Sequence, residues 1–129
     1  MYLVLDTSVL IDIERGVEAT KQKLLKMRLE APYALAVGSI TYTEAFYGYL
    51  KTGKKEDEII DALDKYALLN TTKNSSRIAA EITDFLYGSG KPIPTADIII
   101  ASIAIDSKAV LATKDAHFKG IQNLKVALM

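Results

Sequence analysis

The sequence predicts an α/β fold in which a parallel β-sheet is covered by helices on both faces. Short apolar runs rich in Val, Leu and Ile alternate along the chain with longer amphipathic stretches. The first run, YLVL at residues 2–5, is continuously apolar, which indicates a strand buried on both faces. The 129 residues, half of them hydrophobic, are enough for one compact domain with its own core. We therefore expect residues 1–129 to form a single domain.

The order of the elements follows from these runs and from the residues that interrupt them. Gly16 separates the first two helices, and Pro32 ends the second. The glycine pair that closes NSSRIAAEITDFLYGSG is typical of a helix C-cap. The expected strands cover residues 2–5, 33–39, 67–70, 109–113 and 125–129, and the expected helices cover residues 8–13, 17–30, 41–51, 54–66, 74–90 and 96–108.

Composition narrows the possible functions. The 16 Lys and Arg residues balance the 16 Asp and Glu residues, so no overall positive field attracts nucleic acid or an anionic membrane. The chain has no cysteine, which excludes disulfides and Cys-based zinc sites and fits a reducing compartment. No basic leader precedes the first apolar run, and no uncharged run approaches the ~20 residues of a membrane span. We expect a cytoplasmic protein without a membrane partner.

Four acidic residues occur where the chain leaves its predicted strands. Asp6 directly follows the first strand, and Asp115 follows the strand AVLAT. Glu44 lies in the first turn after the strand ALAVGS, and Asp97 lies in the first turn of the helix that PIPTAD opens. Because ligands bind outside the carboxyl ends of the strands in such sheets, we expect these four side chains to share one edge.

Each of these acids also has a purely structural explanation. Asp6 is a typical N-cap for the helix that follows it, and Asp115 is able to hold the next turn through its backbone amides. Glu44 completes a capping box with Thr41, and the helix dipole favours Asp97 in a first turn.

Their joint placement favours a functional reading. At an effective dielectric near 20, two carboxylates ~4 Å apart repel by roughly 4 kcal/mol. Protonation or a bound divalent cation is therefore needed to neutralise the cluster. Ligands that are all oxygen fit Mg²⁺ or Mn²⁺ better than Zn²⁺.

Four sequence blocks together resemble the PIN-domain ribonucleases, specifically the VapC-type toxins of prokaryotic toxin–antitoxin pairs. The blocks are LVLDTSVLIDI, ITYTEAFYG, GKPIPTADIIIASIAI and VLATKDAHFKGI, and they extend over almost the whole chain in the order of the family. The resemblance implies a three-layer α/β/α sandwich whose parallel five-stranded sheet has the strand order 3-2-1-4-5. It also implies an endoribonuclease that forms homodimers and is inhibited by a small antitoxin.

The resemblance assigns roles to individual residues. It implies that Asp6, Glu44, Asp97 and Asp115 are catalytic and bind one or two Mg²⁺ or Mn²⁺ ions that act on an RNA substrate. Thr113 matches a hydroxyl beside the metal site, and Ser8 matches a small polar residue of the first motif. We place both of these residues at the substrate.

Several residues near these blocks receive a structural interpretation. His117 is expected to be a surface turn residue, with a contact to substrate as the alternative. Asp12 and Glu14 are expected on the solvated side of the first helix, with a position near the entrance of the groove as the alternative. The aromatic residues after Glu44 have helical spacing, which favours packing over base stacking. The candidates for phosphate contacts are Lys51, Lys54, Lys55, Lys91, Lys114 and Lys119.

Other classes of protein stay open at this stage. A receiver-like signalling domain would carry an acidic pair after its first strand, whereas hydroxyl residues follow Asp6. A haloacid dehalogenase-type phosphatase needs a second Asp where this chain has Ser8. A non-catalytic PIN-like module that binds RNA or a partner also remains compatible with the sequence.

Overall fold

The computed structural model describes all 129 residues and contains one parallel five-stranded sheet. Its strand order, β3-β2-β1-β4-β5, is the predicted one. Every neighbouring pair of strands is parallel, so all the carboxyl ends lie at one edge of the sheet. The strands are β1 (Tyr2–Leu5), β2 (Ala34–Gly38), β3 (Ala67–Leu69), β4 (Val110–Thr113) and β5 (Lys125–Leu128).

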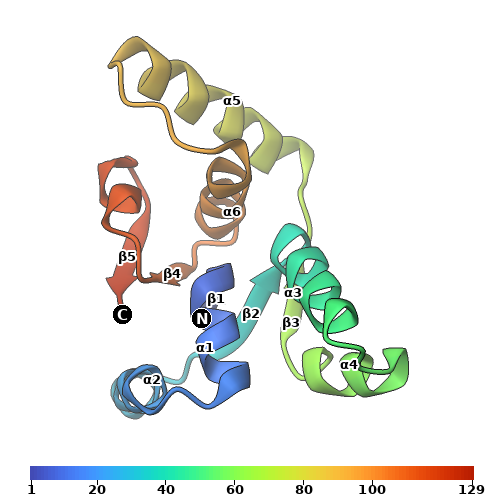
Figure 1. Ribbon diagram of the computed structural model, residues 1–129. Helices are drawn as coiled ribbons and strands as arrows, with labels where there is room; N and C mark the ends of the chain where they lie inside the picture. The colour runs from blue at the N-terminus through green and yellow to red at the C-terminus, as the bar shows by residue number, and fades with distance from the viewer.

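Helices cover both faces of this sheet, which confirms the three-layer α/β/α architecture (Figure 1). Helices α5 and α6 pack against each other along one side, and α1 to α4 contribute to the core of the other side. The helices are α1 (Thr7–Arg15), α2 (Glu18–Glu30), α3 (Ser39–Lys51), α4 (Glu56–Leu63), α5 (Lys73–Gly88) and α6 (Thr95–Asp106), and a short 3₁₀ helix, η1, covers Ala116–Gly120.

The side chains of β1 divide between two hydrophobic clusters, as the two faces of a strand require. Leu3 and Leu5 join the cluster that α1 to α4 cover, whereas Val4 joins the cluster under α6. All three are fully buried. The absence of polar alternation in β1 therefore reflects a central strand covered on both sides, as predicted.

Most element boundaries match the predictions, and the differences have local causes. Gly16 ends α1 with a φ of 74°, the left-handed conformation that glycine adopts without strain. Helix α3 begins at Ser39, two residues earlier than expected, so the predicted capping box of Thr41 and Glu44 is wrong. Its N-cap is Gly38, where a Cβ atom would lie 3.3 Å from Ile103 Cδ1 of α6.

The predicted solvated position of Glu14 is wrong. Its side chain is only 9% exposed and accepts hydrogen bonds from the Tyr49 hydroxyl (2.7 Å) and the Tyr66 hydroxyl (2.6 Å). It also pairs with Lys65 Nζ at 2.8 Å. Burial opposes ionisation, but the hydrogen bonds from Lys65, Tyr66 and Tyr49 outweigh it and lower the pKa of Glu14. Burial and the bond to Glu14 raise the pKa of Tyr49 to about 12.

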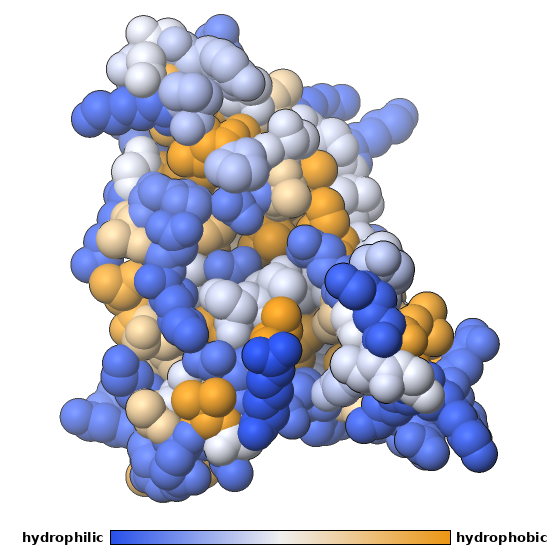
Figure 2. Space-filling view, viewed as in Figure 1, coloured by the Kyte–Doolittle hydropathy of each residue, from blue (hydrophilic) through white to orange (hydrophobic).

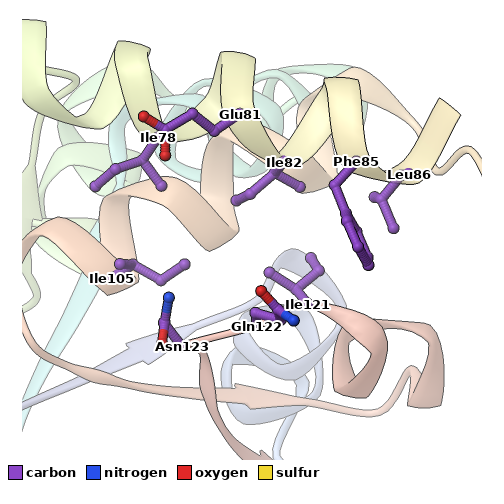
Figure 3. Close-up of a pocket in the computed structure, with 9 residues that line it drawn as sticks. All are labelled: Ile78, Glu81, Ile82, Phe85, Leu86, Ile105, Ile121, Gln122 and Asn123. Carbon is purple, nitrogen blue, oxygen red and sulfur yellow. The ribbon is translucent and has the colours of Figure 1, made fainter. Parts of the chain in front are cut away.

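An apolar hollow of about 160 Å³ lies between α5, α6 and the segment after η1. Figure 2 shows apolar side chains gathered below α5, and Figure 3 shows Ile82 and Phe85 pointing from α5 toward Ile105 and Ile121. Glu81 is the only charged residue among those that surround it. The hollow is thus a gap in the packing of apolar side chains, and it contains no cluster of reactive groups.

No helix in the chain is long and apolar enough to cross a membrane.

The Glu14 hydrogen bonds give a testable stability effect. We expect Glu14→Gln to lower the free energy of unfolding by about 2 kcal/mol at pH 7, because two tyrosine hydroxyls and Lys65 lose a charged, mostly buried acceptor. Since the pKa of Glu14 is lowered by folding, its contribution is present at neutral pH and is lost as the pH falls through that pKa. In urea denaturation, the difference between wild type and variant should therefore shrink as the pH falls through the lowered pKa of Glu14.

The exposed Glu30 supplies the matched control. We expect Glu30→Gln to change stability by less than about 0.5 kcal/mol. Equal losses for the two variants would contradict the role assigned to Glu14.

Candidate active site

The four predicted acids line one cavity at the carboxyl edge of the sheet. The cavity measures about 430 Å³ and is surrounded by polar residues only, namely Asp6, Thr7, Ser8, Glu44, Asp97, Lys114 and Asp115. The parallel register carries β1 and β4 to this edge together, since Leu5 pairs with Ala112. Residues that are up to 109 positions apart in the sequence therefore meet in one place.

Asp6 is the most strongly held of the four acids. Its backbone N–H continues the β1–β4 ladder by donating to the Ala112 carbonyl (2.9 Å). Its Oδ1 accepts from the Thr7 N–H (2.8 Å), so Asp6 also caps α1, and its Oδ2 accepts from Thr113 Oγ1 (2.8 Å). The residue is only 7% exposed. The capping and functional readings of Asp6 are therefore compatible, because one carboxylate begins the helix and faces the cavity.

Thr113 organises two acids at once. Its buried hydroxyl donates to Asp6 and accepts from the Asp115 N–H (3.1 Å). Thr113 is thus placed behind the carboxylates, whereas Ser8 lies directly at the cavity. The structure shows a positioning contact between Thr113 and Asp6, and the predicted contact of Thr113 with substrate stays a prediction.

Glu44 extends from the second turn of α3 and is tied to α1. Its Oε1 accepts a hydrogen bond from Thr7 Oγ1 at 2.9 Å, and Thr7 Oγ1 also lies 3.2 Å from Thr41 Oγ1. Thr7 therefore links the first and second acids, because its backbone N–H donates to Asp6 and its hydroxyl donates to Glu44. Sequence reasoning selected Ser8 and missed Thr7, although Thr7 adjoins Asp6.

Asp97 stands in the first turn of α6, where it is partly buried among other charges. Burial, followed by the negative charge of Asp6, raises the pKa of Asp97. The charge of Asp115 acts in the same direction, and His117 acts against it. An ionised Asp97 is therefore electrostatically unfavourable here, which is the condition that a bound cation would relieve.

His117 lies in the short turn η1, as predicted, and its side chain is 29% exposed, but the prediction missed that the residue lies between two of the acids. Its Nδ1 is 2.8 Å from Asp115 Oδ1, and its Nε2 is 3.1 Å from Asp97 Oδ2. Nε2 is fully buried but lacks a partner with hydrogen-bond geometry. Asp115 also caps η1 by accepting from the His117 N–H (3.1 Å), so the predicted turn-holding role of Asp115 is correct.

The donor set fits a hard divalent cation by its chemistry. Carboxylate and hydroxyl oxygens surround the cavity, and neither sulfur nor a second histidine is available. No three of the acidic and histidine side chains converge closely enough to form a ready-made ligand group. Glu44 instead contacts Thr7, and Asp97 and Asp115 contact His117. The site is therefore compatible with a divalent cation because its ligand atoms are oxygens and because they line the same cavity.

Lys114 is the only basic residue among those that line the cavity. Lys114 follows β4 directly, and its Nζ lies 2.9 Å from Asp12 Oδ2 of α1. The same oxygen of Asp12 accepts from the buried Thr20 hydroxyl at 2.7 Å. Hydrogen bonds from Thr20 and then from Lys114 lower the pKa of Asp12. Asp12 thus belongs to the rim of the site, which agrees with the alternative prediction of a position near the entrance of the groove.

Comparison with known proteins defines the class to which this fold and site belong. The PIN domain family matches residues 3–124, and the chain is therefore a member of that family. The sequence is 38% identical over 103 residues to Ribonuclease VapC3 of Methanocaldococcus jannaschii, a match that covers 80% of this chain and 98% of the relative.

Solved structures show the same architecture. VapBC2 from Rickettsia felis, determined bound to a DNA fragment from its promoter, superposes with a TM-score of 0.83 at 25% identity. The match covers 99% of this chain and 98% of that chain. VapBC-1 from nontypeable Haemophilus influenzae has a TM-score of 0.81 at 23% identity over 99% of this chain and 98% of its own, which is a likeness of fold.

The electrostatic cost at Asp97 leads to a stability prediction. In EDTA at pH 8, we expect Asp97→Asn to raise the melting temperature by about 3 °C, because the isosteric amide removes repulsion from Asp6. We expect a gain in stability because the pKa of Asp97 is raised. The folded state disfavours the ionised carboxyl group, so the wild type loses stability as the pH rises through that pKa.

Calorimetry or circular dichroism provides the measurement, with the exposed Asp84→Asn as control. Addition of Mn²⁺ should then stabilise the wild type more than Asp97→Asn. A melting temperature lowered by Asp97→Asn in EDTA would refute the repulsion argument.

Proposed function

We propose that this chain is a divalent-metal-dependent endoribonuclease and the toxin of a VapBC-type toxin–antitoxin pair. The observation that carries the proposal is the shared cavity of Asp6, Glu44, Asp97 and Asp115 in a PIN-family fold. The identity with Ribonuclease VapC3 supports RNA as the substrate. The cofactor proposed for the four acids is Mg²⁺ or Mn²⁺, as one or two ions.

The proposed reaction is hydrolysis of a phosphodiester bond in RNA. A bound divalent ion supplies a water of lowered pKa and stabilises negative charge on the phosphoryl group. The residues of the chain contribute orientation: the Thr7 N–H and the Thr113 hydroxyl fix both oxygens of Asp6, and Thr7 Oγ1 fixes Glu44. This arrangement reduces the reorganisation required when the acids bind a cation. His117 lies between the other two acids, with ring nitrogens 3.1 Å from Asp97 Oδ2 and 2.8 Å from Asp115 Oδ1.

We further propose a small cognate antitoxin as the protein partner, and a homodimer as the form of the toxin. Two solved structures that share this fold support the antitoxin, because one is described as a toxin–antitoxin complex and the other as a member of the VapBC family of toxin–antitoxin systems. We propose the cytoplasm as the place of action, since RNA is the substrate.

The decisive test is RNA cleavage by the Asp6→Asn variant. We expect the purified wild type to cleave RNA in Mn²⁺ and not in EDTA, and the variant to be slower by at least about 100-fold. The fold should persist, because an asparagine Oδ1 still accepts from the Thr7 N–H and Thr113 Oγ1 is able to accept from the new amide. Structured and unstructured RNAs, followed on gels, provide the measurement.

The exposed Asp61→Asn on α4 controls for loss of a carboxylate away from the site and should cleave at the wild-type rate. Normal cleavage by Asp6→Asn would overturn the mechanism. RNA binding by the wild type without cleavage in either Mg²⁺ or Mn²⁺ would instead establish a non-catalytic RNA-binding module.

A further inference from the structure

Lys114 is the only basic residue among the seven that line the acidic cavity. Six lysines were candidates for phosphate contacts on the basis of sequence, and the other five lie outside this lining. A substrate phosphate that approaches four carboxylates needs a local positive charge, because the chain as a whole has a net charge of zero. The position of Lys114 makes it the side chain able to supply that charge at the cavity itself.

The ammonium group of Lys114 is held away from the four acids. Its contact is with Asp12 Oδ2 on α1, at 2.9 Å, and no contact of salt-bridge length joins it to Asp6, Glu44, Asp97 or Asp115. Asp12 is held in turn by the Thr20 hydroxyl at the start of α2, 2.7 Å away. Residues of α1 and α2 thus determine where this positive charge stands.

We propose that Lys114 binds a phosphate of the RNA backbone at the cavity, and that Asp12, supported by Thr20, positions its ammonium group. An ammonium has three N–H donors, and Asp12 occupies one, so two remain for phosphate oxygens without breaking the ion pair. The side chain of Lys114 is 45% exposed, which leaves it accessible to a ligand. The proposal rests on the proposed nuclease function, and it assigns the residue that receives the substrate.

Asp12 also affects the charge balance of the cavity. Asp12 and Lys114 form an ion pair without net charge, so Lys114 adds no net positive charge next to the carboxylates that are proposed to bind a cation. Without Asp12, the unbalanced ammonium would oppose the cation and would be free to move toward the acids. The ion pair therefore allows a phosphate-binding group and a cation-binding group to coexist in one cavity.

RNA binding tests the first part of the proposal. The probe is a fluorescein-labelled single-stranded RNA, titrated by anisotropy in Mn²⁺ with proteins carrying Asp6→Asn to suppress cleavage. We expect Lys114→Met to weaken binding about fivefold near physiological salt, and to reduce the slope of log K against log salt by about 0.7. The matched control is Lys125→Met, since Lys125 pairs with Val110 at the opposite edge of the sheet.

Mn²⁺ binding without RNA tests the second part, measured by electron paramagnetic resonance at low salt. We expect Asp12→Asn to weaken Mn²⁺ binding at least about tenfold, because it leaves the positive charge of Lys114 unbalanced beside the acids that are proposed to bind the dication. Lys114→Met should tighten Mn²⁺ binding, and the double variant should return to wild-type affinity because the net charge is restored. A merely structural role of Asp12 predicts no such rescue.

The outcomes separate this inference from the proposed function. Cleavage by the wild type together with unchanged RNA affinity and salt slope in Lys114→Met would overturn the inference alone. A double variant that binds Mn²⁺ as weakly as Asp12→Asn would overturn the positioning role of Asp12. If Asp12→Asn does not fold, tighter Mn²⁺ binding by Lys114→Met still decides the charge balance. Absence of both RNA binding and cleavage in the wild type would overturn the proposed function, and this inference with it.

Discussion

The hydrogen bond from Thr113 Oγ1 to Asp6 Oδ2 joins the ends of β1 and β4, and the geometry of the site depends on it. The two strands lie side by side because the apolar residues of β1 are buried against helices on both faces. The parallel register then requires that the chain leave the sheet at equivalent positions of the two strands. Burial of the sheet therefore determines that Asp6 and Asp115 meet, and the Thr113 hydroxyl determines how they are oriented.

The acidic residues of the site reduce the stability of the folded protein. Burial and the charges of Asp6 and Asp115 raise the pKa of Asp97, so this carboxylate is held in an unfavourable place. Glu14 presents the opposite case, because three donors lower its pKa and it stabilises the packing of α1. Both acids are partly buried, and only the partners around them differ. An acid without compensating donors at the carboxyl edge of a sheet is thus a stronger sign of function than burial alone.

The sequence predicted the sheet order and the acids at its edge because both depend on local signals and on a resemblance that spans the chain. Apolar runs identify strands, and parallel strands place their ends together. The side-chain partners were not predictable in the same way. Thr7 reaches Glu44 across 37 positions, and Glu14 reaches Tyr66 across 52, so neither contact leaves a periodic signal. The proximity of His117 to Asp97 was missed for the same reason, since Asp97 belongs to a different helix.

Charge balance within the cavity explains why residues outside the acid set belong to the site. A substrate phosphate requires a positive group nearby, whereas a bound cation requires that no net positive charge compete with it. Lys114 alone would satisfy the first requirement and violate the second. Its pairing with Asp12 satisfies both, because the ammonium keeps free donors while the pair carries no net charge. Thr20 completes this arrangement from α2, so the second helix, which contributes none of the four acids, still influences their electrostatics.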